Sequence, residues 1–177
     1  MGRMSKWFLA YGFADVHDDL IIGAYPLDQR DVAAVARLRI TRLLNLVQDS
    51  EYGAGQRAEV QAALTASGIA ETRLPLIDYG NLPFDQLEDA VNTVVGWLRA
   101  GERVYLHCRA GWQRSAAVAA GAVAIVDQIG LDAALDQIQR RKPTADPLPH
   151  QRRDLARWWD QRPATEPITP PREAGGR

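Results

Sequence analysis

The stretch Val104-Tyr-Leu-His-Cys-Arg-Ala-Gly-Trp-Gln-Arg-Ser-Ala-Ala-Val118 joins a short apolar run to an alanine-rich run through a more polar segment. Its first residues have the length and composition of a buried strand, and those from Arg114 onward have the composition of a buried helix. Gly111 lets the backbone turn tightly between the two. The stretch therefore predicts a strand, a tight loop and a helix that begins where the loop ends.

Other strand-length apolar runs accompany this one, at residues 20–22, 43–47 and 72–74. Helical patterns lie between and after them, at residues 30–39, 56–67, 84–100, 114–128, 131–141 and 151–161. Strands that alternate with helices are typical of a layered α/β domain. We expect a central, mostly parallel sheet flanked by helices.

Length and composition predict one domain. The chain has 177 residues, of which 46% are hydrophobic, enough for one core. We place that domain at residues 1–162 and expect a disordered tail at residues 163–177, where four prolines and two adjacent glycines leave little to bury. The apolar segment at residues 6–13 is too short to span a bilayer and is expected to pack on the domain.

Charge and cysteine usage narrow the function classes. A net charge of -1 gives no overall basic field, so no nucleic-acid partner is expected, and no stable membrane association is expected either. The single cysteine, Cys108, excludes an intrachain disulfide and a CxxC-type metal site. We expect a cytoplasmic protein without a metal or other cofactor.

The segment from Cys108 to Arg114 has the features of an anion-binding loop. A loop that leads from a buried strand into a helix points successive backbone N–H groups inward, and the helix dipole adds to their attraction for an anion. The Arg114 guanidinium can donate to two oxygens of one phosphate. The dipole and this cation also lower the pKa of a cysteine thiol, which makes Cys108 a candidate nucleophile. Residues predicted to bind the substrate are Arg109, Ala110, Gly111, Trp112, Gln113 and Arg114.

His107, Cys108, Arg114 and Ser115 match the signature H-C-x5-R-[ST] of the protein-tyrosine phosphatase superfamily. The chain also resembles the dual-specificity branch at residues 20–26 and 40–46, and the resemblance covers about residues 20–158. It implies that superfamily's single-domain fold and hydrolysis of phosphomonoesters through a cysteinyl-phosphate intermediate. The implied partner is a phosphorylated protein, on phosphotyrosine or phosphoserine/threonine, or a small phosphomonoester.

The resemblance also implies roles for single residues. Residues 74–83 look like the family's acid loop and place Asp78 as the proton donor. Asp85 is the alternative donor, although it is expected in the first turn of the next helix, where it would interact with the helix dipole. Ser115 would donate to the sulfur when the cysteinyl-phosphate is hydrolysed. His107 would hold the loop by hydrogen bonding rather than take the thiol proton.

Several residues keep two interpretations. Trp112 is either a packing residue or an aromatic residue at the rim of the phosphate pocket. Arg109 either is a solvated surface charge or makes the pocket favour polyanionic substrates. Tyr52 is expected near the end of a strand, with no role assigned. Gln151 is expected to be an exposed helical residue, although some relatives use a polar position there to place water.

Alternative functions also stay open at this point. The first is a phosphoinositide or other non-protein phosphatase, because one scaffold serves several substrate classes. The others are a rhodanese-type sulfurtransferase, whose loop is commonly one residue shorter, and a catalytically silent phosphate-binding module. The sequence selects neither the physiological substrate nor the oligomeric state.

Overall fold

The computed structural model describes residues 3–163, which contain a five-stranded sheet in the order β1-β2-β5-β3-β4. β1 pairs antiparallel with β2, and the other neighbouring strands pair in parallel. The expected mostly parallel sheet is therefore confirmed. The strands are β1 (Phe13–His17), β2 (Leu20–Gly23), β3 (Arg42–Asn45), β4 (Ala70–Arg73) and β5 (Val104–His107).

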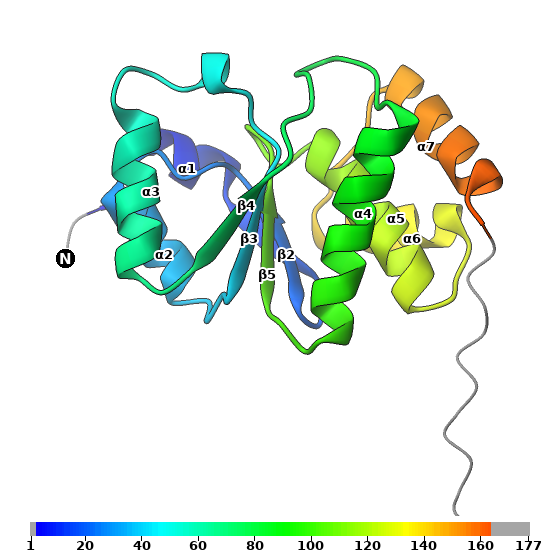
Figure 1. Ribbon diagram of the computed structural model, residues 1–177, viewed down its shortest axis with the longest axis horizontal. Helices are drawn as coiled ribbons and strands as arrows, with labels where there is room; N and C mark the ends of the chain where they lie inside the picture. The colour runs from blue at the N-terminus through cyan, green and yellow to red at the C-terminus, as the bar shows by residue number, and fades with distance from the viewer. Residues whose placement is uncertain (1–2, 164–177) are drawn as a thin grey trace, which may run out of the picture.

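Helices cover both faces of this sheet (Figure 1). α1, α2 and α3 lie against one face, and α4, α5, α6 and α7 lie against the other. The helices of the described residues are α1 (Lys6–Tyr11), α2 (Gln29–Ala36), α3 (Gln56–Ala66), α4 (Phe84–Arg99), α5 (Arg114–Val126), α6 (Leu131–Arg141) and α7 (Pro149–Gln161), with a short 3-10 helix, η1 (Asp49–Glu51). None of them is long and apolar enough to cross a membrane.

The three inner strands, β2, β3 and β5, contribute to two cores. Ile21 and Tyr105 belong to the core under α1, α2 and α3, whereas their neighbours Ile22 and Leu106 belong to the core under the other helices. Successive side chains of a strand point to opposite faces, so a strand covered on both faces must be apolar throughout. This burial explains why the strand runs in the sequence do not alternate.

Helix α5 is buried along nearly its whole length. It lies among α4, α6 and α7, which explains its small residues: a Cβ at Gly121 would already come within 2.9 Å of the Val91 side chain. This packing holds α5 in place and so also fixes its first turn, where Arg114 and Ser115 lie.

The parallel strands end at a common level. Gly23 of β2 and Asn45 of β3 both pair with His107 of β5, so the loops that follow these strands leave the sheet at the same edge. In an open α/β sheet, the carboxyl ends of the strands are where ligands bind. Both η1 and the loop between β4 and α4 rise from this edge (Figure 1).

The amino-terminal segment differs in part from the expectation. Residues 6–11 pack on the domain through Phe8, which is 1% exposed, but the strand β1, which was not predicted, begins at Phe13. Only Val16 of β1 is buried, so this strand lacks the apolar run by which the other strands were predicted. The predicted tail, beyond Pro163, lies outside the described residues.

Candidate active site

The loop from Cys108 to Gln113 connects β5 directly to α5, as expected. Gly111 makes its turn with φ of 74°, a backbone conformation that favours glycine. A Cβ at this position would also come within 2.5 Å of the backbone of Gly23. Two independent constraints therefore require glycine at position 111.

Backbone hydrogen bonds orient the peptide groups of this loop. The carbonyl oxygen of Arg109 accepts from the Tyr25 N–H at 3.1 Å, and that of Trp112 accepts from the Asp146 N–H at 2.7 Å. Within residues 3–163, the backbone N–H groups of residues 109–112 have no hydrogen-bond acceptor. Unpaired N–H groups in a tight loop before a helix form a site for an anion.

Cys108 is 3% exposed, and its Sγ lies 3.3 Å from the Ser115 Oγ. Burial raises the pKa of the Cys108 thiol. The Arg114 charge, the Ser115 hydroxyl and the backbone N–H groups of Ser115 and Gln113 lower it, and they prevail, so the pKa lies below its ordinary value. The thiolate is thus favoured by its surroundings, and a thiolate is the nucleophilic form of cysteine.

The pH dependence of alkylation tests this electrostatic arrangement. Because the pKa of Cys108 is lowered, labelling by iodoacetamide should reach half its maximal rate at a lower pH than for free cysteine. In Ser115→Ala the midpoint should move upward, since one stabilising hydrogen bond is lost. A wild-type midpoint at or above that of free cysteine would contradict the prediction.

His107 is fully buried, and desolvation lowers its pKa to about 3, so it is neutral near pH 7. Its Nδ1 lies 3.2 Å from the Cys108 carbonyl oxygen. A carbonyl can only accept, so Nδ1 carries the proton and donates. This contact holds the loop backbone, in keeping with the scaffold role that the resemblance implied.

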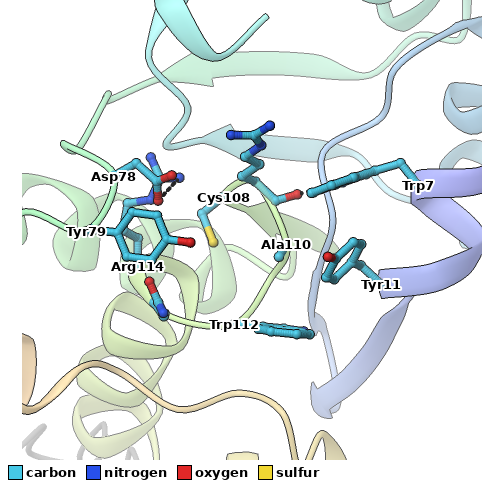
Figure 2. Close-up of a pocket in the computed structure, with 10 residues that line it drawn as sticks. Trp7, Tyr11, Asp78, Tyr79, Cys108, Ala110, Trp112 and Arg114 are labelled. Atoms are coloured by element: carbon cyan, nitrogen blue, oxygen red, sulfur yellow. Dashed lines mark hydrogen bonds and ion pairs between the residues drawn. The ribbon is translucent and has the colours of Figure 1, made fainter.

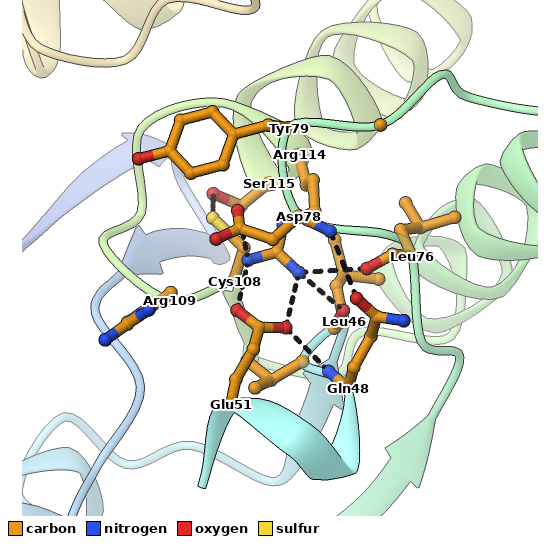
Figure 3. A network of polar contacts seen from close by, with 12 residues as sticks. Leu46, Gln48, Glu51, Leu76, Asp78, Tyr79, Cys108, Arg109, Arg114 and Ser115 are labelled. Carbon is orange, nitrogen blue, oxygen red and sulfur yellow. Dashed lines mark hydrogen bonds and ion pairs between the residues drawn. The ribbon is translucent and has the colours of Figure 1, made fainter.

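Arg114 is 1% exposed and enclosed by acceptors (Figure 3). Its two terminal nitrogens donate to the carboxylate of Glu51 at 2.8 and 2.7 Å, and Nη1 also reaches the carbonyl oxygens of Leu46 and Leu76. Nε has no partner within the described residues. Glu51 thus fixes the guanidinium and leaves Nε–H unpaired.

Asp78 lies on the other side of the same guanidinium. Its Oδ1 is 2.9 Å from the Arg114 Nη2, and it lines the pocket above Cys108. Asp85 instead lies in the exposed first turn of α4. The structure therefore places Asp78, and not Asp85, beside the sulfur and the arginine.

Contacts within the loop and from α7 hold the turn that carries Asp78. The Gly80 N–H donates to the Ile77 carbonyl at 3.0 Å, and Tyr79 has a positive φ of 55°. Gln151 and His150 of α7 both contact the Gly80 carbonyl oxygen, at 3.0 and 3.1 Å. The acid loop is thereby anchored to α7.

These contacts correct the expectation for Gln151. Its side chain is fully buried and bridges the Leu148 N–H and the Gly80 carbonyl oxygen, so it is not an exposed helical residue.

Tyr52 does not line the pocket. Its hydroxyl accepts a hydrogen bond from the Asn45 side chain at 2.7 Å, and burial raises the pKa of Tyr52 to about 12. Its contacts indicate a packing role next to Tyr25.

Aromatic side chains surround the opening above Cys108 (Figure 2). The pocket has a volume of about 290 Å³, and Figure 2 places Trp7 and Tyr11 across it from Asp78 and Tyr79. Trp112 lines it too, 37% exposed and packed on Tyr11 at 5.1 Å, so it is both a packing residue and part of the rim. The pocket is lined by Trp7, Tyr11, Asp78, Tyr79, Cys108, Arg109, Ala110, Trp112, Gln113 and Arg114.

Arg109 is the second cation of this pocket. Its guanidinium lies 5.3 Å from the centre of the Trp7 ring, a cation–π distance, and it forms no ion pair with a carboxylate among the described residues. Arg114, in contrast, contacts two carboxylates. Arg109 is therefore the uncompensated positive charge at the rim.

Comparison with known proteins agrees with this geometry. Residues 20–161 match the family model described as the catalytic domain of dual specificity phosphatases, and the chain belongs to that family. It is a phosphatase-type hydrolase, and the match favours this activity over the sulfurtransferase alternative.

Solved structures share the fold. Tk-PTP in its active form is 21% identical, with a TM-score of 0.72 over 84% of this chain and 97% of that chain. PTPMT1 in complex with PI(5)P is 20% identical, with a TM-score of 0.70 over 84% and 94%. Human DUSP28 is 22% identical, with a TM-score of 0.65 over 84% and 93%.

Sequence reasoning missed Glu51, Trp7 and Tyr11. Glu51 is separated from Arg114 by 63 residues, and no local pattern marks it. Trp7 and Tyr11 were included only in an apolar packing segment. Their spacing of four residues, which puts two aromatic rings on one face of a helix, is the signal that was available.

Proposed function

We propose that residues 1–162 form a phosphatase domain that hydrolyses phosphomonoesters through a cysteinyl-phosphate at Cys108. The observation that carries the proposal is the position of the Cys108 sulfur, beneath the pocket and beside Arg114 and Ser115, with its pKa lowered by both. The cytoplasmic location inferred from the single cysteine stays a prediction.

In the binding step, the phosphate enters the pocket and accepts hydrogen bonds from the loop N–H groups of residues 109–112. Arg114 donates from Nε, which is unpaired, and from Nη2, where a phosphate oxygen replaces the Asp78 carboxylate as the acceptor. Glu51 keeps the other donors of the guanidinium occupied, so that it presents one edge to the substrate.

In the transfer step, the thiolate attacks phosphorus, the S–P bond forms and the bond to the leaving oxygen breaks. Asp78 in its protonated form gives its proton to that oxygen, which leaves as an alcohol or phenol. Arg114 and the loop donors stabilise the charge on the transferring group.

In the hydrolysis step, a water molecule attacks the phosphorus of the cysteinyl-phosphate and gives a proton to Asp78. The S–P bond breaks and inorganic phosphate is released. The Ser115 hydroxyl, 3.3 Å from the sulfur, donates to the departing thiolate. The cycle restores the thiolate and the protonated carboxyl.

The proposed substrate is a phosphorylated protein, on phosphotyrosine or phosphoserine/threonine. The aromatic rim, with Tyr79 68% exposed, offers an apolar surface to the leaving group. A phosphoinositide is the second candidate, because the uncompensated Arg109 can bind a further anionic group and because PTPMT1, similar in fold, was solved with PI(5)P.

A turnover screen tests this function. Phosphotyrosine peptides, phosphoserine peptides, phosphoinositides and phosphorylated nucleotides are offered to the wild-type chain and to Cys108→Ser in buffer with a metal chelator. The proposal expects phosphate release by the wild type alone, since the loop and Arg114 supply the charge stabilisation. No release from any class, or release that needs a divalent ion, would overturn it.

Replacing Glu51 with glutamine tests how Arg114 is held. The variant loses the charge that pairs with a buried guanidinium, so kcat/KM should fall about tenfold and stability by roughly 1–3 kcal/mol. Steady-state kinetics and thermal unfolding measure the two effects. Asp49→Asn is the matched control, because the Asp49 side chain is 84% exposed and pairs with Arg73. Equal behaviour of the two variants would contradict this role of Glu51.

A further inference from the structure

Helix α1 lies outside residues 20–161, the part of the chain that matches the family, yet it contacts the phosphate-binding loop. The indole Nε1–H of Trp7 donates to the carbonyl oxygen of Arg109 at 3.1 Å. The same oxygen accepts from the Tyr25 N–H at 3.1 Å. Two donors from different segments therefore hold one carbonyl of the loop.

Holding this carbonyl also orients a neighbouring donor. In a planar trans peptide, the C=O of one residue and the N–H of the next point in opposite directions. When the Arg109 carbonyl points toward Trp7 and Tyr25, the N–H of Ala110 must point away from them. Ala110 lines the pocket, and its N–H has no acceptor among the described residues.

If the proposed function holds, the ligand of this N–H is the phosphate that binds above Cys108. We infer that Trp7 is a positioning residue for catalysis, which orients the Arg109–Ala110 peptide so that the Ala110 N–H donates to a phosphate oxygen. Donors fixed before the reaction stabilise developing charge without reorganisation. Trp7 itself acts through the loop backbone.

The fold, rather than local helix propensity, holds Trp7 in place. A helix of six residues is too short to be stable by itself. At its start, Ser5 donates from its N–H and hydroxyl to the buried Asp31 at 2.8 and 2.6 Å. At its end, the buried Lys142 ammonium donates to the Tyr11 carbonyl oxygen at 3.0 Å. Together with buried Phe8, these contacts fix α1 at both ends.

Trp7 also packs through its ring, and this packing can be separated from its hydrogen bond. The ring lies 4.2 Å from that of Tyr11 and 6.0 Å from that of Tyr25, with the Arg109 guanidinium over one face. A phenylalanine at position 7 keeps an aromatic ring in this cluster but has no N–H. The benzothiophene analogue of tryptophan, in which sulfur replaces the indole N–H group, keeps the full shape.

The test compares Trp7→Phe, the benzothiophene analogue and wild type in vanadate affinity, inorganic phosphate affinity, kcat and KM. We expect both changes at Trp7 to weaken vanadate binding about three- to tenfold and to lower kcat/KM by a similar factor, the usual size for one hydrogen bond. Trp97→Phe is the matched control, because Trp97 lies on α4, does not line the pocket, and forms no hydrogen bond through its indole N–H among the described residues. It should bind vanadate as wild type does.

The outcomes distinguish this inference from the proposed function. If both Trp7 changes leave vanadate affinity and kcat/KM at wild-type values while the wild type turns over phosphomonoesters, the inference is wrong and the function stands. If the Trp7→Phe variant unfolds, the analogue decides the question, since it preserves packing. If the wild-type chain neither binds vanadate nor releases phosphate, the proposed function fails and the inference fails with it.

Discussion

Cys108→Ser should abolish phosphate release from every substrate that the wild type accepts, yet the variant should still bind vanadate or phosphate. A serine hydroxyl in this loop stays protonated and is a far weaker nucleophile than a thiolate. Arg114 does not depend on the sulfur, since its hydrogen bonds run to Glu51, Leu46 and Leu76. The loop N–H groups are oriented by backbone hydrogen bonds to the loop carbonyls, which do not involve the sulfur either. Binding is therefore expected to survive the loss of turnover.

Two measurements check this result. Phosphate release is followed with an aryl phosphate, and vanadate affinity is followed by calorimetry on the same preparation. Ser115→Ala is a useful companion, because it removes only the donor to the sulfur and should leave partial activity. Turnover near the wild-type rate in Cys108→Ser would exclude Cys108 as the nucleophile.

Asp78→Ala should lower kcat by roughly 10²–10⁴ for substrates with poor leaving groups, and by less for an activated aryl phosphate, whose leaving oxygen needs little protonation. The structure adds a second expectation. Asp78 contacts the Arg114 Nη2 at 2.9 Å, where a phosphate oxygen must accept the hydrogen bond in its place, so removing the carboxylate should strengthen vanadate binding several-fold. Loss of rate together with a gain in anion affinity is a signature that simple unfolding would not produce.

The matched control for this experiment is Asp85→Ala. Asp85 lies in the exposed first turn of α4 and does not line the pocket, so its replacement should change kcat little. Steady-state kinetics with one alkyl and one aryl substrate separate the two variants. If Asp85→Ala instead shows the leaving-group dependence, the assignment of the proton donor to Asp78 is wrong.

Much of the fold follows from local patterns. Runs of apolar residues identified β2, β3 and β5, because strands covered on both faces must be apolar throughout. β1 escaped detection because only Val16 is buried in it, and β4 starts before the predicted run because it is a partly exposed edge strand. Edge strands carry a weaker pattern since one side of them faces solvent.

The sequence by itself determined the phosphate-binding loop. Cys108, Gly111, Arg114 and Ser115 lie within eight residues, so the turn of the loop and the first turn of α5 bring them together whatever the rest of the chain does. Asp78 was found only through the family resemblance of its loop. The catalytic roles of these residues remain predictions, whereas the structure shows Asp78, Cys108 and Arg114 lining one pocket and Ser115 in contact with the sulfur.

The tertiary structure alone decided what surrounds this loop. Glu51 reaches Arg114 across 63 residues, Gln151 reaches Gly80 across 71, and Trp7 reaches Arg109 across 102. Nothing local in the sequence identifies these side chains as partners of the loop, because a carboxylate, an amide or an indole is equally compatible with an exposed position. Which distant side chain meets the loop depends on how strands and helices pack, and that packing is set by the summed burial of the whole core rather than by any one segment.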